Sequence, residues 1–295
     1  MNLLKCILTE NRCYTSAQVV APCGVMVHST GANNPTLRRY VQPSKDDPNY
    51  EQLMELLGKN RYDNDWNCPT PGGSKVCVHG FIGKLADDTV AAVQTLPWDI
   101  VGWHSGYASK RSTTNANKLG YIGFEICEDD LCDPNYFAEI YQTAVDLTAY
   151  LCRLYGFDPQ GKNQYGYPFI TCHREGFDLG IAYCHADVLH WFPKYGKSMD
   201  TFRADVAAAM ENTEEEETEV RYQKLVDIPD KWNFRNIIDM LMTAGIIAGD
   251  GSDPDGNGDV IDLSYDMVRL IIFDYRAGVY DDAIRAAGLD PDVYK

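Results

Sequence analysis

The sequence lacks any long apolar run. No stretch of its 295 residues approaches the roughly 20 consecutive apolar residues that a membrane-spanning helix needs. Residues 1–18 alternate apolar and polar side chains and include Glu10 and Arg12, so they lack the basic start and continuous apolar core of a signal peptide. We therefore expect no membrane insertion, and synthesis in the cytoplasm without a signal peptide.

Positive charge is also scarce. The chain has 26 lysines and arginines against 43 aspartates and glutamates, which gives a formal net charge of −17. A protein that binds nucleic acid needs a basic surface to face the phosphates. The charge balance therefore argues against a nucleic-acid partner.

The cysteines lack the paired spacing of metal fingers and disulfide frameworks. There are ten of them, and no two are separated by two residues. Cys77, Cys127, Cys152 and Cys172 lie in apolar stretches, where a free cysteine packs as a small hydrophobic residue. We expect the cysteines to be mostly reduced and structural.

Strand-like and helical patterns alternate over the first 210 residues. Short apolar or β-branched runs predict strands at 24–28, 76–82, 89–93, 121–127 and 169–172. Apolar residues at helical spacing predict helices at 50–57, 134–155 and 199–210, the second opened by Asp133 and closed by Gly156. This alternation is typical of an α/β layer fold.

A run of glutamates at 211–219 has no apolar face, and we interpret it as an acidic linker between two domains. The predicted domains are 1–210, which carries the chemistry, and 220–295. The second has helical periodicity at 231–244, 264–277 and 281–287, which predicts a small all-α module.

One segment of this module, Asp253–Asp259, resembles the front half of a calcium loop. Its twelfth position is Ser264, where a calcium loop has a bidentate glutamate. We therefore expect an ordinary turn there rather than a Ca²⁺ site.

Two histidines and an aspartate form a candidate metal site. His28 and His173 each follow a strand-like run, and Asp187 lies in the loop beyond the second. A hydrolytic zinc takes three such ligands and keeps one position open. Glu125, in an apolar strand, is either a proton shuttle with a raised pKa or a solvent-facing residue of an alternating strand. His185 could donate a hydrogen bond to an oxyanion.

A resemblance bears on these alternatives. The segments GVMVHSTGANNP, WHSG, IGFEICE, ITCHREG and HADVLHWF occur in this order. Together they resemble the zinc N-acetylmuramoyl-L-alanine amidases of the amidase-2 family, and most of all those of clostridial prophage endolysins, over residues 1–205. The family shares its fold with peptidoglycan recognition proteins, which implies a central mixed β-sheet flanked by helices.

The resemblance also implies roles for individual residues. His28, His173 and Asp187 would bind one Zn²⁺, with Cys184 as the alternative to Asp187, and Glu125 would be the catalytic carboxylate. His185 occupies the place where the family often has lysine or threonine. His104 in the WHSG segment is expected to contact substrate, and we also name Asn33 and Trp66 as candidate groove residues.

The implied reaction is hydrolysis of the amide between N-acetylmuramic acid and L-alanine in bacterial peptidoglycan. We interpret the chain as an endolysin that reaches the wall once a holin opens the membrane. The module 220–295 resembles small helical modules that follow the catalytic domains of clostridial cell-wall enzymes, which implies cell-wall binding or self-association. Two alternatives stay open: a non-catalytic peptidoglycan-binding protein on the same fold, and a cytoplasmic amidase that recycles muropeptides.

Overall fold

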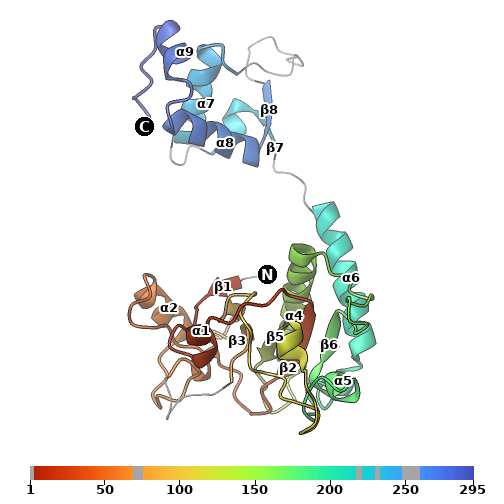
Figure 1. Cartoon of the computed structure of the whole chain (residues 1–295). Coiled ribbons are helices and arrows are strands. Elements are labelled where there is room, and N and C mark those ends of the chain that lie inside the picture. The colour runs from red at the N-terminus through yellow and green to blue at the C-terminus, as the bar shows by residue number, and fades with distance from the viewer. Residues whose placement is uncertain (1–2, 69–75, 217–220, 230–232, 248–259) are drawn as a thin grey trace. The chain divides into compact units, whose positions relative to one another are not determined.

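Six short strands form a mixed sheet in the computed structural model of the chain (Figure 1). Their order is β1-β4-β3-β5-β2-β6, and every neighbouring pair is parallel except β3 and β4. The bounds are β1 Leu3–Lys5, β2 Gly24–Ser29, β3 Gly80–Lys84, β4 Val90–Gln94, β5 Tyr121–Ile126 and β6 Ile170–Cys172. The predicted mixed sheet is confirmed.

The structure describes all residues except 1–2, 69–75, 217–220, 230–232 and 248–259. The chain divides into two compact units, Met1–Asn212 and Thr213–Lys295. The sheet belongs to the first unit. Among the described helices, none is both long and apolar enough to cross a membrane.

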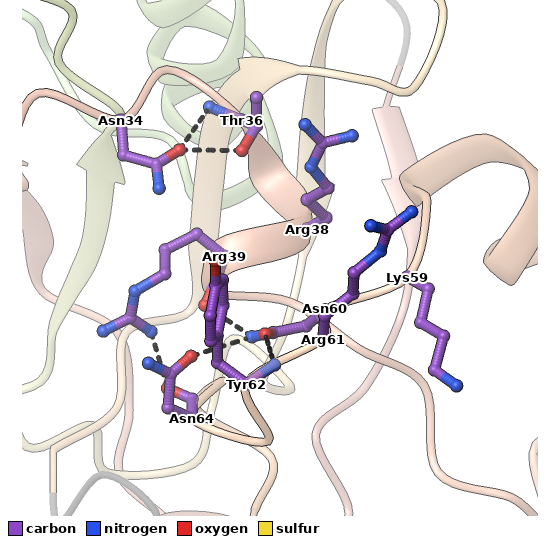
Figure 2. A pocket seen from close by; sticks show the side chains of 9 residues that line it. All are labelled: Asn34, Thr36, Arg38, Arg39, Lys59, Asn60, Arg61, Tyr62 and Asn64. Carbon is purple, nitrogen blue, oxygen red and sulfur yellow. Dashed lines mark hydrogen bonds between the residues drawn. The ribbon is translucent and has the colours of Figure 1, made fainter.

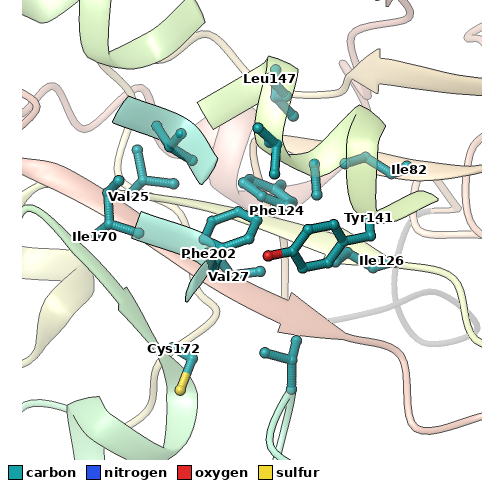
Figure 3. Packing of buried hydrophobic residues seen from close by; sticks show 14 of the residues in the cluster. Val25, Val27, Ile82, Phe124, Ile126, Tyr141, Leu147, Ile170, Cys172 and Phe202 are labelled. Carbon is teal, nitrogen blue, oxygen red and sulfur yellow. The ribbon is translucent and has the colours of Figure 1, made fainter. Parts of the chain in front are cut away.

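The helix α4 (Pro134–Tyr155) packs on one face of the sheet, together with α6 (Met199–Glu216). Asp133 begins α4 by accepting hydrogen bonds from the first-turn amides, and Gly156 ends it in the left-handed conformation, as the sequence predicts. The apolar side of α4 buries residues such as Leu147 against Phe124, and Phe202 of α6 joins the same cluster (Figure 3).

The opposite face of the sheet has its own apolar cluster. The 3₁₀ turn η1 (Leu37–Arg39) and the helix α2 (Tyr50–Leu57) pack there against Phe81 of β3. Because successive strand residues point to opposite faces, the burial of Val27 and Phe124 under α4 leaves their neighbours His28 and Glu125 on this second face. The candidate site is therefore built on the side of the sheet away from α4.

Four shorter elements complete the first unit: α1 (Arg12–Ser16), α3 (Ala116–Leu119), α5 (His173–Asp178) and η2 (Phe192–Tyr195). The sequence predicts only an extended lead-in over residues 1–20. Helix α1 forms there because the side chain of Asn11 caps it by accepting from the amide of Cys13. Helix α5 starts directly after β6, so His173 is the first residue of the helix.

The glutamate run differs from the predicted linker over 211–219. Helix α6 continues to Glu216, so the first six residues of that stretch are helical. Glutamate, alanine and methionine are good helix formers, and a helix that is already nucleated at residue 199 propagates through them without needing an apolar face.

The second unit contains the three predicted helices, now bounded as α7 (Phe234–Thr243), α8 (Tyr265–Arg276) and α9 (Asp281–Ala286). It also contains the 3₁₀ turn η3 (Leu225–Asp227) and an antiparallel pair, β7 (Arg221–Lys224) and β8 (Val260–Ser264). The module is therefore not all-α. Its strands are short, and the alternation of β8 (Val, Ile, Asp, Leu, Ser) is too brief to separate from a turn by pattern. The Asp253–Asp259 segment lies outside the described residues.

All ten cysteines are free thiols in the structure, which agrees with the expectation that they are reduced. Seven of them are buried, and burial raises the pKa of thiols such as Cys23 and Cys152 to about 12. These side chains pack as small apolar residues in the core.

Replacing the cap of α4 tests its contribution to stability. We expect Asp133→Ala to lower the free energy of unfolding by about 1 kcal/mol, since two first-turn amides lose their acceptor. Urea denaturation followed by circular dichroism measures this. Glu139→Ala, an exposed change on the same helix, is the control and should stay within about 0.5 kcal/mol of the native protein. Equal effects would contradict the capping role.

Candidate metal centre and active site

Three of the predicted residues lie close together, two of them because of parallel strand pairing. Val27 of β2 pairs with Cys172 of β6, so the next residue of each segment, His28 and His173, lie side by side. Asp187 joins them from the loop that follows α5. The Nδ1 atoms of the two histidines are 3.1 Å apart, and Asp187 Oδ2 lies 3.2 Å from His28 Nδ1 and 3.4 Å from His173 Nδ1. All three residues are buried.

These separations match those of a tetrahedral metal site. Zinc–nitrogen and zinc–oxygen bonds of about 2.0–2.1 Å place neighbouring ligand atoms of a tetrahedron about 3.3 Å apart. Two imidazole nitrogens and a carboxylate oxygen can all bind one divalent ion. The donor set and its spacing therefore fit a single metal ion with one open position.

Cys184, the alternative third ligand, does not belong to this group. Its side chain is exposed, and Asp187 supplies the third donor atom. The hydrogen bonds with His173 and His28 hold the pKa of Asp187 well below its usual range, although burial by itself would raise it. Asp187 is therefore an ionised carboxylate suited to metal binding.

Glu125 lies directly beside this group. It is the register partner of His28 across the β2–β5 pair and points to the same face of the sheet. Its Oε2 atom is buried and has no hydrogen-bond partner in the described part of the chain. Burial raises the pKa of Glu125 well above its usual value, and the negative charges of Asp187 and Glu128 add to the shift. Of the two readings of Glu125, the geometry favours the proton shuttle.

His104 contacts the ring nitrogen of His28 that is not part of the metal group. Its Nδ1 is 2.9 Å from His28 Nε2, and its Nε2 is 3.1 Å from the carbonyl oxygen of Tyr121. Both ring nitrogens are therefore engaged within the protein, which leaves neither for the substrate contact that the sequence predicts. Burial lowers the pKa of His104 well below its usual value, helped by His28 and His79, so the ring is neutral.

Two glycines make room for the His104 ring. A Cβ atom on Gly123 would lie 2.6 Å from His104 Nδ1, and one on Gly102 would lie 3.0 Å from His104 Cδ2. The first distance is shorter than real Cβ contacts, and the second is tighter than most of them, so a side chain at either position would push on the ring. The absence of a side chain at these two positions is thus a condition for the hydrogen bond between His104 and His28.

His185 lies at the edge of the group. Its ring stacks on that of His173 with 4.8 Å between centroids, and its Nδ1 is 3.5 Å from Asp187 Oδ1. More than half of the side chain, 57%, is exposed. An imidazole held in this way can reach a bound substrate.

The other two predicted substrate residues do not touch the metal group. Asn33 is exposed in the loop after β2. The ring of Trp66 is partly buried and packs edge-on against Phe81, at 4.9 Å, and Tyr40, at 6.4 Å. The ring of Trp66 therefore packs against the core.

Sequence reasoning missed Tyr40 and Glu128. Burial raises the pKa of Tyr40 to about 12, with Glu125 among the charges that add to the shift, and its buried hydroxyl has no partner among the described residues. Glu128 Oε1 accepts from the amide of Gly31 and lies 2.9 Å from His190 Nε2. Glu128 ends the IGFEICE segment and follows strand β5, but nothing in the sequence indicates that it contacts Gly31 and His190, and Tyr40 belongs to none of the quoted motifs.

Comparison with known proteins identifies a family for most of the first unit. Residues 18–187 match the model of a family described as N-acetylmuramoyl-L-alanine amidase, Amidase_2. No curated protein matches the chain. Among solved structures, the hydrolase AmiA of Staphylococcus aureus is 19% identical over 73% of this chain and 86% of its own, with a TM-score of 0.46. A mutant endolysin from Bacillus subtilis is 17% identical over 70% of this chain and 99% of its own, with a TM-score of 0.40.

The family match covers more than half of the chain and contains the paired strands β2 and β5, Glu125 on β5, and all three residues of the metal group. It ends at Asp187, the last member of that group. The chain therefore belongs to the amidase-2 family of N-acetylmuramoyl-L-alanine amidases, enzymes that hydrolyse an amide bond of bacterial peptidoglycan.

Proposed function

We propose that the chain is a zinc-dependent amidase in which His28, His173 and Asp187 hold one Zn²⁺ and Glu125 transfers the proton. The observation that carries this proposal is the convergence of three buried ligand atoms beside a buried carboxylate oxygen that has no protein partner. When bound, zinc supplies a Lewis acid that polarises the scissile carbonyl and makes water a better nucleophile.

Two protein side chains have separate roles, one in proton transfer and one in binding the carbonyl oxygen. Glu125 has a raised pKa, so it can take a proton from the attacking water and then release it to the leaving amine of L-alanine. His185, exposed beside Asp187, donates a hydrogen bond to the oxygen of the carbonyl as its carbon becomes tetrahedral. The bond that breaks joins the lactyl carbonyl of N-acetylmuramic acid to the L-alanine nitrogen.

His104 acts as a positioning residue for the metal ligand. A carbonyl oxygen only accepts hydrogen bonds, so His104 Nε2 carries a proton for Tyr121 and the Nδ1 of this neutral ring is an acceptor. His28 Nε2 must then donate to it, which leaves the Nδ1 lone pair of His28 for the metal. The other metal histidine has no such support, because His173 Nε2 lacks a partner among the described residues.

We further propose that the enzyme is an endolysin of clostridial prophage type that acts on the wall after release from the cytoplasm, with the second unit binding wall or mediating self-association. The order of motifs quoted above supports the first part. A complete ligand group with its glutamate favours an enzyme over a binding protein on the same fold. The attached second unit argues against an enzyme for soluble muropeptides, which needs no anchor.

Replacing the glutamate tests the reaction. We expect the native protein to release peptides that begin at L-alanine from purified peptidoglycan, and Glu125→Gln to lower this rate by about 10²–10⁴-fold. Mass spectrometry of the digest measures the products, and elemental analysis should show zinc retained in the variant. A native protein that binds wall but releases nothing would overturn the amidase, and an active Glu125→Gln would overturn the role of the carboxylate.

The His104 hydrogen bond is tested by metal affinity. We expect His104→Phe to weaken Zn²⁺ binding by about 10–100-fold, because His28 loses the partner that fixes its tautomer. Gly123→Ala should have a similar effect, since the new Cβ would displace the ring. Competition with a chromophoric chelator measures the affinity.

Two variants serve as references for this measurement. His104→Gln can both accept and donate through its amide and should lose less affinity than His104→Phe. His190→Phe, which changes a histidine that contacts Glu128 rather than the metal group, should bind Zn²⁺ as the native protein does. Native affinity in His104→Phe would show that His104 has no role in metal binding.

A further inference from the structure

A basic pocket lies outside the metal centre. It has a volume of about 790 Å³, and four cations line it, Arg38, Arg39, Lys59 and Arg61, together with the amide side chains of residues such as Asn34 (Figure 2). No acidic side chain is among its lining residues. In a chain with a formal net charge of −17, this gathering of positive charge needs an explanation.

Three of the four cations are available to a ligand. Arg38, Lys59 and Arg61 are exposed and make no hydrogen bond or ion pair with any residue that the structure describes. Like charges that share a pocket repel each other, so they do not stabilise the fold by themselves. An anion seated among them would remove this repulsion.

The fourth cation and the loop around it are held in place. Arg39 donates through Nη1 to the carbonyl oxygen of Asn64, 2.6 Å away, and its guanidinium lies 5.3 Å from the centroid of the Tyr40 ring. Buried Asn60 accepts from the amide of Tyr62 and donates to Asn64 Oδ1. The loop that carries Arg61 is thus fixed by its own hydrogen bonds, which makes the pocket a preformed one.

The pocket and the metal centre lie on the same face of the sheet. Arg39 packs on Tyr40, Tyr40 stacks on Phe81 at 5.3 Å between centroids, and Phe81 is the register partner of Glu125. Glu125 in turn pairs with His28. Asn34 in the pocket wall is six positions after His28, so the Cα atoms of the two lie at most about 20 Å apart.

We infer that this pocket binds a free carboxylate of the substrate's peptide stem, on the L-alanine side of the bond that is cut. The inference rests on the proposed function. An extended peptide advances about 3.4 Å per residue, so the distal carboxylates of a stem of four or five residues reach about 15 Å from the scissile amide, a length comparable with the upper limit of about 20 Å on the separation of His28 and Asn34. Guanidinium groups pair with carboxylates through two parallel hydrogen bonds.

This arrangement gives the pocket a role in selectivity. A stem whose carboxylates are free would be held at two points, the metal centre and the pocket. A stem whose carboxylates are amidated would lose the second point, because an amide carries no charge for the arginines to neutralise. The pocket therefore distinguishes walls by the amidation of their stems.

The test uses the full chain and two synthetic muramoyl peptides that differ only in whether the stem carboxylates are free or amidated. We expect the native protein to cleave the free-acid substrate with a kcat/KM about tenfold or more above that of the amidated one. The double variant Arg38→Gln with Arg61→Gln should lose this preference, with its kcat/KM on the free-acid substrate falling to about that on the amidated one. The control, Arg12→Gln with Lys194→Gln, makes the same charge change at exposed positions outside the pocket and should keep the preference.

A binding measurement separates this inference from the proposed function. Calorimetry with the reaction product, the stem peptide beginning at L-alanine, requires no catalysis. Binding of the free-acid peptide that is lost in the pocket variant, in a protein that cleaves neither substrate, would keep the pocket and reject the amidase. Cleavage of both substrates at equal rates by both proteins would keep the amidase and overturn the pocket. Stronger binding of a glycerol phosphate oligomer than of the free-acid peptide would also overturn it, in favour of a phosphate-bearing wall polymer.

Discussion

The structure depends on the parallel pairing of β2 with β5 on one side and β6 on the other. This pairing puts His28 level with Glu125 and brings His173 alongside at the point where β6 passes into α5. A shift of one residue in either register would turn these side chains to the face covered by α4, because strand side chains alternate. The apolar residues that fix the register, such as Val27 and Phe124 under α4, therefore also determine the face on which His28 and Glu125 lie.

The contact between His104 and His28 is a second constraint on the site. The neutral ring of His104 fits against the backbone of Gly123, itself two residues before Glu125 on the same strand. Strand β5 thus serves both sides of the site: its glutamate lies beside the metal group, and its glycine makes room for the ring that contacts His28. On the same face, the row from Glu125 through Phe81 and Tyr40 to Arg39 links this centre to the basic pocket.

Much of this could be predicted from the sequence. The long helix α4 was predictable because Asp133, Pro134 and Gly156 mark its ends. The metal group was predictable because His28 and His173 follow apolar runs, Asp187 lies in the loop after the second run, and all three belong to an ordered set of motifs. The role of His104 was not, since its partner lies 76 residues away and a lone histidine in a loop carries no sign of what it faces. The basic pocket was also missed, because its cations are spread over two segments, near residues 38 and 60, that meet only in the fold.

The three metal ligands are separated by up to 159 residues along the chain. In the unfolded chain no local segment offers two of them at chelating distance, so a metal ion has little to bind until β2 and β6 have paired. Metal binding is then linked to the native state alone, and at a free concentration 100 times the dissociation constant it adds about 2.7 kcal/mol to the free energy of unfolding. Under the proposed zinc dependence, metal supply would set the resistance of this unit to heat and proteolysis as well as its turnover, and an enzyme deprived of metal would also be a less durable protein.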